Sequence, residues 1–176
     1  MSAAVTDSTP PGTHLPEAEA ALAALAERMA PAVAHDAALV GIYSGGAWIA
    51  ERLATMLTGE HAVGFIDVSF YRDDYNRSGL KPNTRRTALP FDVEGATIVL
   101  IDDVLYTGRS VRAAINELFD FGRPAAIELA VLIDRGGREL PIDPTYTGAR
   151  LTVACDLSIV LSRDDEGKLS LGVEPA

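Results

Sequence analysis

The sequence predicts an α/β fold in which a mostly parallel central sheet is flanked by helices and followed by a C-terminal β-hairpin. Short apolar runs alternate along the chain with segments whose apolar residues recur at helical spacing. This alternation is typical of a parallel sheet with helices on both faces. The last two apolar runs, 157–161 and 169–173, flank the sequence Asp-Asp-Glu-Gly, which indicates a hairpin turn.

The first half of the chain contains two predicted helices and two predicted strands. Apolar residues at helical spacing predict an amphipathic helix over residues 17–29, which Pro31 ends. The predictions that follow are a buried strand at 38–42, a turn at Ser44, Gly45 and Gly46, a helix at 47–57 and a strand at 63–71. The turn comes directly after a strand, which is where ligands bind in sheets of this kind.

The second half begins with a long polar segment, residues 72–89, which contains Gly and Pro and is expected to be a loop. Loops longer than about 15 residues in compact domains are usually functional or disordered. The predicted elements after it are a buried strand at 96–101, a helix at 110–121 closed by Gly122, and an apolar strand at 126–133.

The bulk composition indicates one ordinary globular domain, residues 17–176, after a disordered leader, residues 1–16. Hydrophobic residues make up 48% of the 176 residues and charged residues 23%. The leader lacks the basic start and apolar stretch of a secretory signal, and no apolar run reaches the roughly 18 residues of a membrane helix. With Cys155 as its one cysteine, the chain is expected to be cytoplasmic and not membrane-bound.

The charge of the chain is strongly acidic but uneven. A net charge of −10 argues against general binding of nucleic acid or of anionic membranes. One segment carries five basic residues against two acidic ones, and so has a net charge of +3: it contains Arg72, Asp73, Asp74, Arg77, Lys81, Arg85 and Arg86. A solvated loop and an anion-binding site both explain it, and its length and charge favour the anion site.

The stretch with the strongest chemical signal is the run from Ile98 to Val111. An apolar strand ends in two carboxylates, Asp102 and Asp103, and a short loop then opens a helix. The start of a helix presents unpaired backbone N–H groups that bind phosphate. A neighbouring carboxylate pair can accept hydrogen bonds from a diol or hold Mg²⁺ through water. A phosphate site beside a diol site predicts binding of a ribose 5-phosphate.

This stretch resembles the signature for phosphoribosyl pyrophosphate (PRPP) of the type I phosphoribosyltransferases. Within them the chain looks most like the PyrR family, which are pyrimidine operon regulators and uracil phosphoribosyltransferases. The strings that carry the resemblance are FYRDD from Phe70, PFDV from Pro90, VLIDDVLYTGRSV from Val99, FGRP from Phe121, LAVLIDRG from Leu129 and RELP from Arg138. The resemblance implies the type I fold, with a small hood beside the sheet.

The resemblance also implies a role for individual residues. Asp102 and Asp103 would bind the ribose hydroxyls and the Mg²⁺ shell, and together with Arg72 they are the candidate catalytic residues. Thr107, Gly108, Arg109 and Ser110 would hold the 5-phosphate. The pyrophosphate loop would be Ser44, Gly45 and Gly46, and the mobile hood would include Tyr71, Arg72, Arg85 and Arg86. The base side would contain Tyr106, Asp134 and Arg135.

Three departures from the PyrR pattern bear on the activity. The loop after the first strand usually reads Lys-Thr-Arg-Gly, whereas here it is Tyr43-Ser-Gly-Gly and lacks a cation. The basic N-terminal helix linked to RNA binding has here a single basic residue, Arg28. A histidine of the family is replaced by Gly137. The first departure indicates weaker catalysis, and the other two argue against RNA binding.

The resemblance implies that the chain converts uracil and PRPP to UMP and pyrophosphate with Mg²⁺ as cofactor. Tyr106 stands where related purine enzymes have Asp, which favours a pyrimidine. Two alternatives stay open: a regulator of pyrimidine-operon RNA that senses UMP or PRPP with little catalysis, and a phosphoribosyltransferase for another base. The resemblance also implies a homodimer or a higher homo-oligomer.

Overall fold

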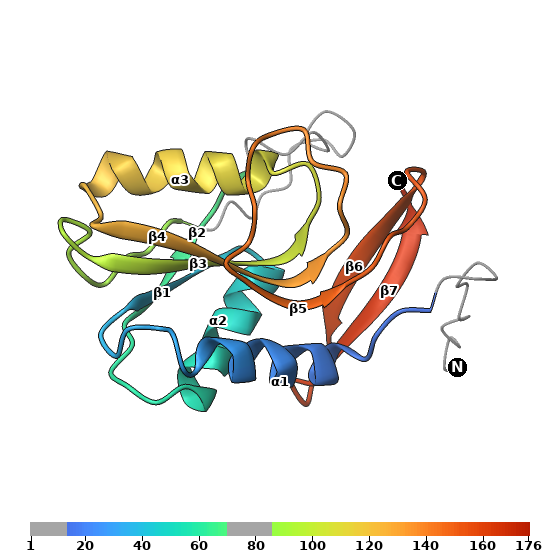
Figure 1. Ribbon diagram of the computed structural model, residues 1–176, viewed down its shortest axis with the longest axis horizontal. Helices are drawn as coiled ribbons and strands as arrows, with labels where there is room; N and C mark the ends of the chain where they lie inside the picture. The colour runs from blue at the N-terminus through green and yellow to red at the C-terminus, as the bar shows by residue number, and fades with distance from the viewer. Residues whose placement is uncertain (1–13, 70–85) are drawn as a thin grey trace.

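The computed structural model describes residues 14–69 and 86–176, and it places a five-stranded parallel sheet at the centre of the molecule (Figure 1). The order of the strands is β2-β1-β3-β4-β5, and every neighbouring pair is parallel. The strands are β1 (Ala38–Ile42), β2 (Val63–Ile66), β3 (Thr97–Leu105), β4 (Ala126–Asp134) and β5 (Tyr146–Arg150). The predicted α/β fold with a parallel sheet is therefore confirmed.

Helices cover both faces of this sheet, and alternating strand residues supply the two halves of the core. Helices α1 (Ala18–Met29) and α2 (Gly45–Met56) pack on one face, and α3 (Arg109–Phe121) packs on the other. The α1/α2 face buries Leu39, Val99, Ile101 and Leu132, whereas the α3 face buries Val40, Ile98, Leu100 and Val131. Burial on both faces explains why the strands read as continuous apolar runs.

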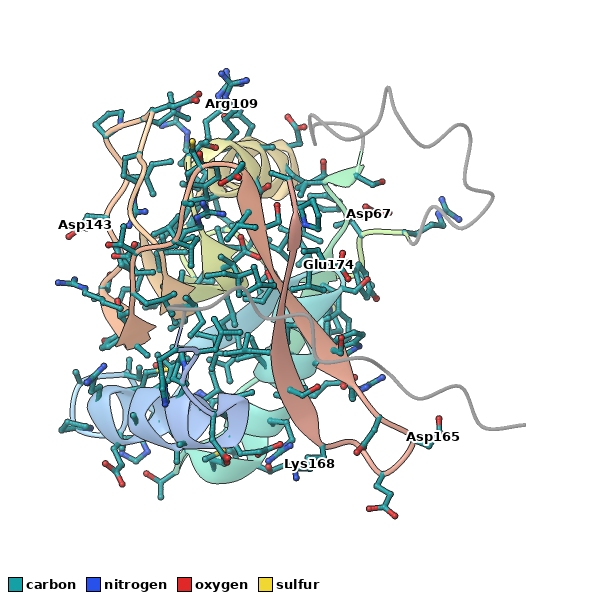
Figure 2. The ribbon with its side chains drawn as sticks, turned by 90° about the vertical axis from the view of Figure 1, so that its right-hand side faces the viewer. Asp67, Arg109, Asp143, Asp165, Lys168 and Glu174 are labelled. Atoms are coloured by element: carbon teal, nitrogen blue, oxygen red, sulfur yellow. The ribbon has the colours of Figure 1, made fainter. Side chains whose placement is uncertain are left out.

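The predicted C-terminal hairpin is also present, as β6 (Leu157–Arg163) paired with β7 (Leu169–Pro175). Figure 2 views it from the front, with its tip at the end of the molecule opposite Arg109. Glu19 of α1 links the hairpin to the helices. The Glu19 carboxylate accepts hydrogen bonds from the Leu169 N–H at 2.9 Å and from the Arg52 guanidinium at 2.8 Å. The hydrogen bond from Arg52, followed by that from Leu169, lowers the pKa of Glu19.

One strand, β5, was missed because its sequence, Tyr-Thr-Gly-Ala-Arg, has a weak strand signal. Contacts with neighbouring elements, rather than the strand propensity of its own residues, hold β5 in the sheet. It pairs with β4, and the Arg28 guanidinium donates to the carbonyls of Thr147 and Gly148. A Cβ on Gly148 would lie 2.6 Å from the backbone oxygens of Ala21 and Leu132, so α1 can approach the strand only at a glycine. Burial, and then a hydrogen bond to Glu128, raises the pKa of Tyr146 to about 12.

Several predicted boundaries were wrong, and two of them bear on function. Helix α2 begins at Gly45, so the predicted turn at residues 44–46 is largely the first turn of the helix. The predicted strand 63–71 ends at Ile66, where the Asp67 carboxylate accepts the Ser69 N–H at 2.9 Å and turns the chain. The predicted leader lies largely outside the described residues. Within the described ranges, no helix has both the length and the apolar character needed to cross a membrane.

Candidate active site

The carboxyl ends of β1 and β3 lie side by side at the point where the connections of the sheet diverge, and the space outside these two strand ends is here called the crevice. β1 leads into α2 on one face, and β3 leads into α3 on the other. Ligands of open parallel sheets bind outside the strand ends at such a switch point. The two segments that the sequence singles out, residues 44–46 and 102–110, both lie at this crevice.

The carboxylates Asp102 and Asp103 lie within β3, which corrects the expectation that the strand ends before them. The strand continues because residues 102–105 still pair with β4. Alternation therefore directs the two side chains to opposite faces. Asp102 is 3% exposed and accepts the Asp103 N–H at 3.0 Å, whereas Asp103 is half-buried on the α2 face. The pair is thus divided into a buried carboxylate and one at the crevice.

The first turn of α2 packs directly against the end of β3. A Cβ on Gly45 would lie 2.2 Å from the Asp103 Oδ2, and one on Gly46 would lie 2.3 Å from the Ile101 carbonyl oxygen. The two glycines are therefore needed for this close approach. Because they occupy the first turn, their N–H groups have no partner within the helix. The peptide bond before this turn, Tyr43–Ser44, is cis.

Residues 107–110, the predicted phosphate cradle, form the loop between β3 and α3 and the start of the helix. Gly108 has a φ of 91°, in the left-handed region that favours glycine, and it forms the N-cap of α3. The Arg109 N–H donates a hydrogen bond to the Thr107 hydroxyl oxygen, with a nitrogen–oxygen distance of 3.3 Å. The Arg109 guanidinium lies on the surface, 2.6 Å from the Glu139 carboxylate (Figure 2 labels Arg109 at the upper end). Because this guanidinium pairs with Glu139, the backbone N–H groups and hydroxyls at the start of α3 are the donors that the predicted cradle would use.

Arg138, which the sequence analysis did not single out, clamps the end of β3 to the end of β4. Its guanidinium donates to the Asp134 Oδ1 at 2.7 Å, the Tyr106 carbonyl oxygen at 3.0 Å and the Ile142 carbonyl oxygen at 2.9 Å. Asp134, predicted at the base side, is thus buried in a structural ion pair. The string Asp-Arg-Gly-Gly-Arg could have indicated this ion pair, because it places an Asp and an Arg four residues apart after a strand.

Arg135 and Tyr106, both predicted on the base side, lie together. The Arg135 guanidinium carbon is 4.0 Å from the centroid of the Tyr106 ring. This cation–π contact contributes about 0.5–2 kcal/mol. Arg135 is 6% exposed, and it donates to the Leu157 carbonyl oxygen at 2.7 Å and to the Ala154 carbonyl oxygen at 3.2 Å. The side chain therefore joins Tyr106 to the start of the hairpin.

Three of the predicted site residues, Tyr71, Arg72 and Arg85, lie outside the described residues, as does most of the predicted hood. The residues on either side of the undescribed range are part of the described structure. Arg86 is exposed, and Phe65 and Ala88 exchange two backbone hydrogen bonds of 2.8 Å. The chain therefore returns to the β2 edge of the sheet before it continues to β3.

Comparison with known proteins agrees with this geometry. A family model described as the phosphoribosyl transferase domain matches residues 13–156. A hypoxanthine phosphoribosyl transferase from Trypanosoma cruzi has a TM-score of 0.65 at 20% identity, over 92% of this chain and 91% of its own. A hypoxanthine-guanine phosphoribosyltransferase from Bacillus anthracis has a TM-score of 0.62 at 15% identity, over 79% and 83%. The fold is that of the type I phosphoribosyltransferases.

Similarity to curated proteins narrows this class. A "Bifunctional protein PyrR" from Ralstonia nicotianae is 56% identical over 146 residues, which are 83% of both chains. A protein of the same name from Nitrosococcus oceani is 44% identical over 149 residues, or 84% of both. The chain belongs to the PyrR family of phosphoribosyltransferases, as its sequence motifs predict.

The clamp at Arg138 predicts a large loss of stability when this side chain is removed. Arg138→Ala should lower the free energy of unfolding by about 2–4 kcal/mol, because the buried Asp134 carboxylate loses its hydrogen-bonded cation and keeps only the more distant, exposed Arg150. Arg150→Ala is the matched control. Its guanidinium is 68% exposed and 3.6 Å from the same carboxylate, so its loss should cost less than about 0.5 kcal/mol. Urea denaturation measures both, and equal losses would contradict the clamp.

Proposed function

We propose that the chain transfers the ribose 5-phosphate group of PRPP to uracil, giving UMP and pyrophosphate. The observation that carries this proposal is the meeting of the Asp103 carboxylate with the first turn of α2, beside the cradle at the start of α3. The proposal takes Asp103 as an acceptor for ribose hydroxyls and the starts of α2 and α3 as two sets of donors for phosphate groups. Membership in the PyrR family supports uracil as the base.

Each part of PRPP has a place in this arrangement. Backbone N–H groups and hydroxyls of residues 107–110 would hold the 5-phosphate, and Gly45 and Gly46 would face the pyrophosphate. Asp103 would accept hydrogen bonds from the ribose hydroxyls, and the buried Asp102 would hold it in position through the Asp103 N–H. Tyr106 and Arg135 would stand on the base side.

The Asp103 carboxylate at the crevice fits Mg²⁺, because hard oxygen atoms are its preferred ligands, whereas the buried Asp102 would act on the site through the Asp103 N–H. No group of three ligand-bearing side chains occurs in the described ranges, so oxygens of PRPP and water would complete the coordination. When bound, Mg²⁺ would offset negative charge on the departing pyrophosphate.

In the reaction the bond from the anomeric carbon to pyrophosphate breaks, and a bond from N1 of uracil to the same carbon forms. The N1 proton passes to water or to the departing pyrophosphate, and positive charge develops on the ribose before the new bond is complete. Asp103, which lies at the ribose hydroxyls in this arrangement, would offset that positive charge. Pyrophosphate leaves on the side of the α2 glycines, opposite the incoming base.

Release of pyrophosphate from PRPP tests this proposal. We expect release with uracil and Mg²⁺, and much less with other bases or without the metal. Asp103→Asn should weaken PRPP binding, measured by calorimetry, about tenfold or more, because a charged acceptor is replaced by a neutral one. Asp165→Asn, at the exposed tip of the hairpin, is the control for the same chemical change and should bind PRPP as the wild type does (Figure 2).

Two outcomes would contradict the proposal. Unchanged PRPP affinity in Asp103→Asn would show that the site lies elsewhere. Faster release with a purine than with uracil would keep the site and reassign the base.

A regulatory role through RNA is the second candidate function, because the relatives are named bifunctional. This name weighs against the expectation that the chain does not bind RNA. The structure of α1 supports the expectation. Its one basic side chain, Arg28, is directed at the backbone carbonyls of Thr147 and Gly148, whereas Glu27 and the N-cap residue Glu17 are exposed. Acidic side chains repel a polyanion.

We therefore predict weak binding to a pyrimidine-operon leader RNA. The dissociation constant should exceed about 1 μM at physiological salt, because few Lys or Arg side chains are available to release counterions from phosphates. A gel-shift titration with and without UMP measures it. Sub-micromolar binding stimulated by UMP would make regulation the principal role.

A further inference from the structure

The position of the Tyr106 ring depends on a neighbouring glycine. Gly137 has a φ of 74°, and a Cβ built on it would lie 2.3 Å from the Tyr106 Cε2 and 2.8 Å from its Cδ2. Non-bonded carbon atoms do not approach so closely, because optimal separations are about 3.5–4.0 Å. The ring therefore occupies space that any other residue at position 137 would fill.

The adjacent residue, Gly136, differs in this one respect. Its φ is 71°, almost the same as that of Gly137, but a Cβ built on it would meet no atom within 4 Å. An alanine at either position would carry a similar backbone strain, since both lie in the left-handed region. An alanine at position 137 alone would also displace the tyrosine. A comparison of alanine variants at the two positions can therefore distinguish the effect of backbone strain from the effect of contact with the Tyr106 ring.

The backbone of Tyr106 cannot easily follow a displaced ring. Arg138 donates to the Tyr106 carbonyl oxygen at 3.0 Å and to the Leu105 carbonyl oxygen at 3.4 Å, and so holds the end of β3. A side chain at position 137 must therefore rotate the Tyr106 ring and leave the phosphate cradle in place. Such a rotation also moves the ring off the Arg135 guanidinium, which two carbonyls at the start of the hairpin hold.

We propose that Gly137 and Arg135 are positioning residues that together fix the Tyr106 ring, and that this ring sets the affinity of the site for the base. The proposal rests on the proposed function, because it takes Tyr106 to stand on the base side. Arg135 provides a planar cation against the ring, and Gly137 provides the space beside it. The binding of PRPP, which the cradle and Asp103 would hold, should be independent of both.

The first experiment compares Gly136→Ala with Gly137→Ala. In Gly137→Ala the KM for uracil should rise about tenfold or more, because the displaced ring would no longer stack against the base. The KM for PRPP should change less than about twofold. In Gly136→Ala both constants should change less than about twofold. Equal rises in the uracil KM of the two variants would assign the effect to backbone strain and overturn the proposal.

A second readout does not depend on turnover. Chemical shifts of the tyrosine rings, with Tyr106 assigned by Tyr106→Phe, should move in Gly137→Ala and stay in place in Gly136→Ala. If the wild-type protein releases no pyrophosphate with any base, the proposed function fails, but the positioning of Tyr106 is still tested by these shifts and by UMP titration. An unmoved Tyr106 signal in Gly137→Ala would overturn the proposal whatever the activity.

A double-mutant cycle completes the test. On a Tyr106→Leu background, Gly137→Ala should add less than about twofold to the uracil KM, because the ring that it displaces is gone. An undiminished effect on that background would contradict the proposal. Arg135→Lys keeps the charge but loses the planar group, and should raise the uracil KM in the same direction. If Gly137→Ala does not fold, Arg135→Lys is the variant that tests the position of the ring. An unchanged uracil KM in Arg135→Lys would contradict the role proposed for Arg135.

Discussion

The close approach of α2 to the end of β3 is the constraint on which the crevice depends. The Gly45 backbone lies against the Asp103 carboxylate, and the Gly46 backbone lies against the Ile101 carbonyl. A side chain at Gly46 would force the helix away from the strand, and one at Gly45 would displace the Asp103 carboxylate. The missing cation in this loop, which looked like a departure that weakens catalysis, thus coincides with a packing requirement for two small residues. Backbone N–H groups at the start of α2 are what the loop offers to an anion.

A second set of contacts fixes the other wall of the crevice. Arg138 binds the last carbonyls of β3 to Asp134 of β4, and Arg135 binds the start of the hairpin. Two cations that follow one strand therefore have different tasks. Arg138 stabilises the backbone of the cradle, whereas Arg135 presents its guanidinium to Tyr106. The hairpin is in this way connected to the base side of the site, although it lies outside the central sheet.

Much of this arrangement was predictable from sequence because it depends on local patterns. Apolar runs identified four of the five strands of the sheet, and the Asp-Asp and Thr-Gly motif identified the crevice. Strand β5 escaped because neighbouring elements, rather than its own residues, hold it in the sheet. The sequence did not predict that β3 extends through Asp102 and Asp103, because pairing with β4 outweighs the polarity of the two carboxylates. The role of Gly137 depends on a contact with Tyr106 across the chain, which no local pattern reveals.

The most direct test of the account is to map the backbone amide shifts when PRPP and Mg²⁺ are added to the isotope-labelled protein. The account predicts the largest changes at residues 107–110, at Gly45 and Gly46, and at Asp103. The alternative is the open cavity of about 580 Å³ on the far side of β5, lined by residues that include Arg28, Thr147 and Arg150. Changes concentrated there, with the amides of residues 107–110 unmoved, would contradict the assignment of the crevice as the site.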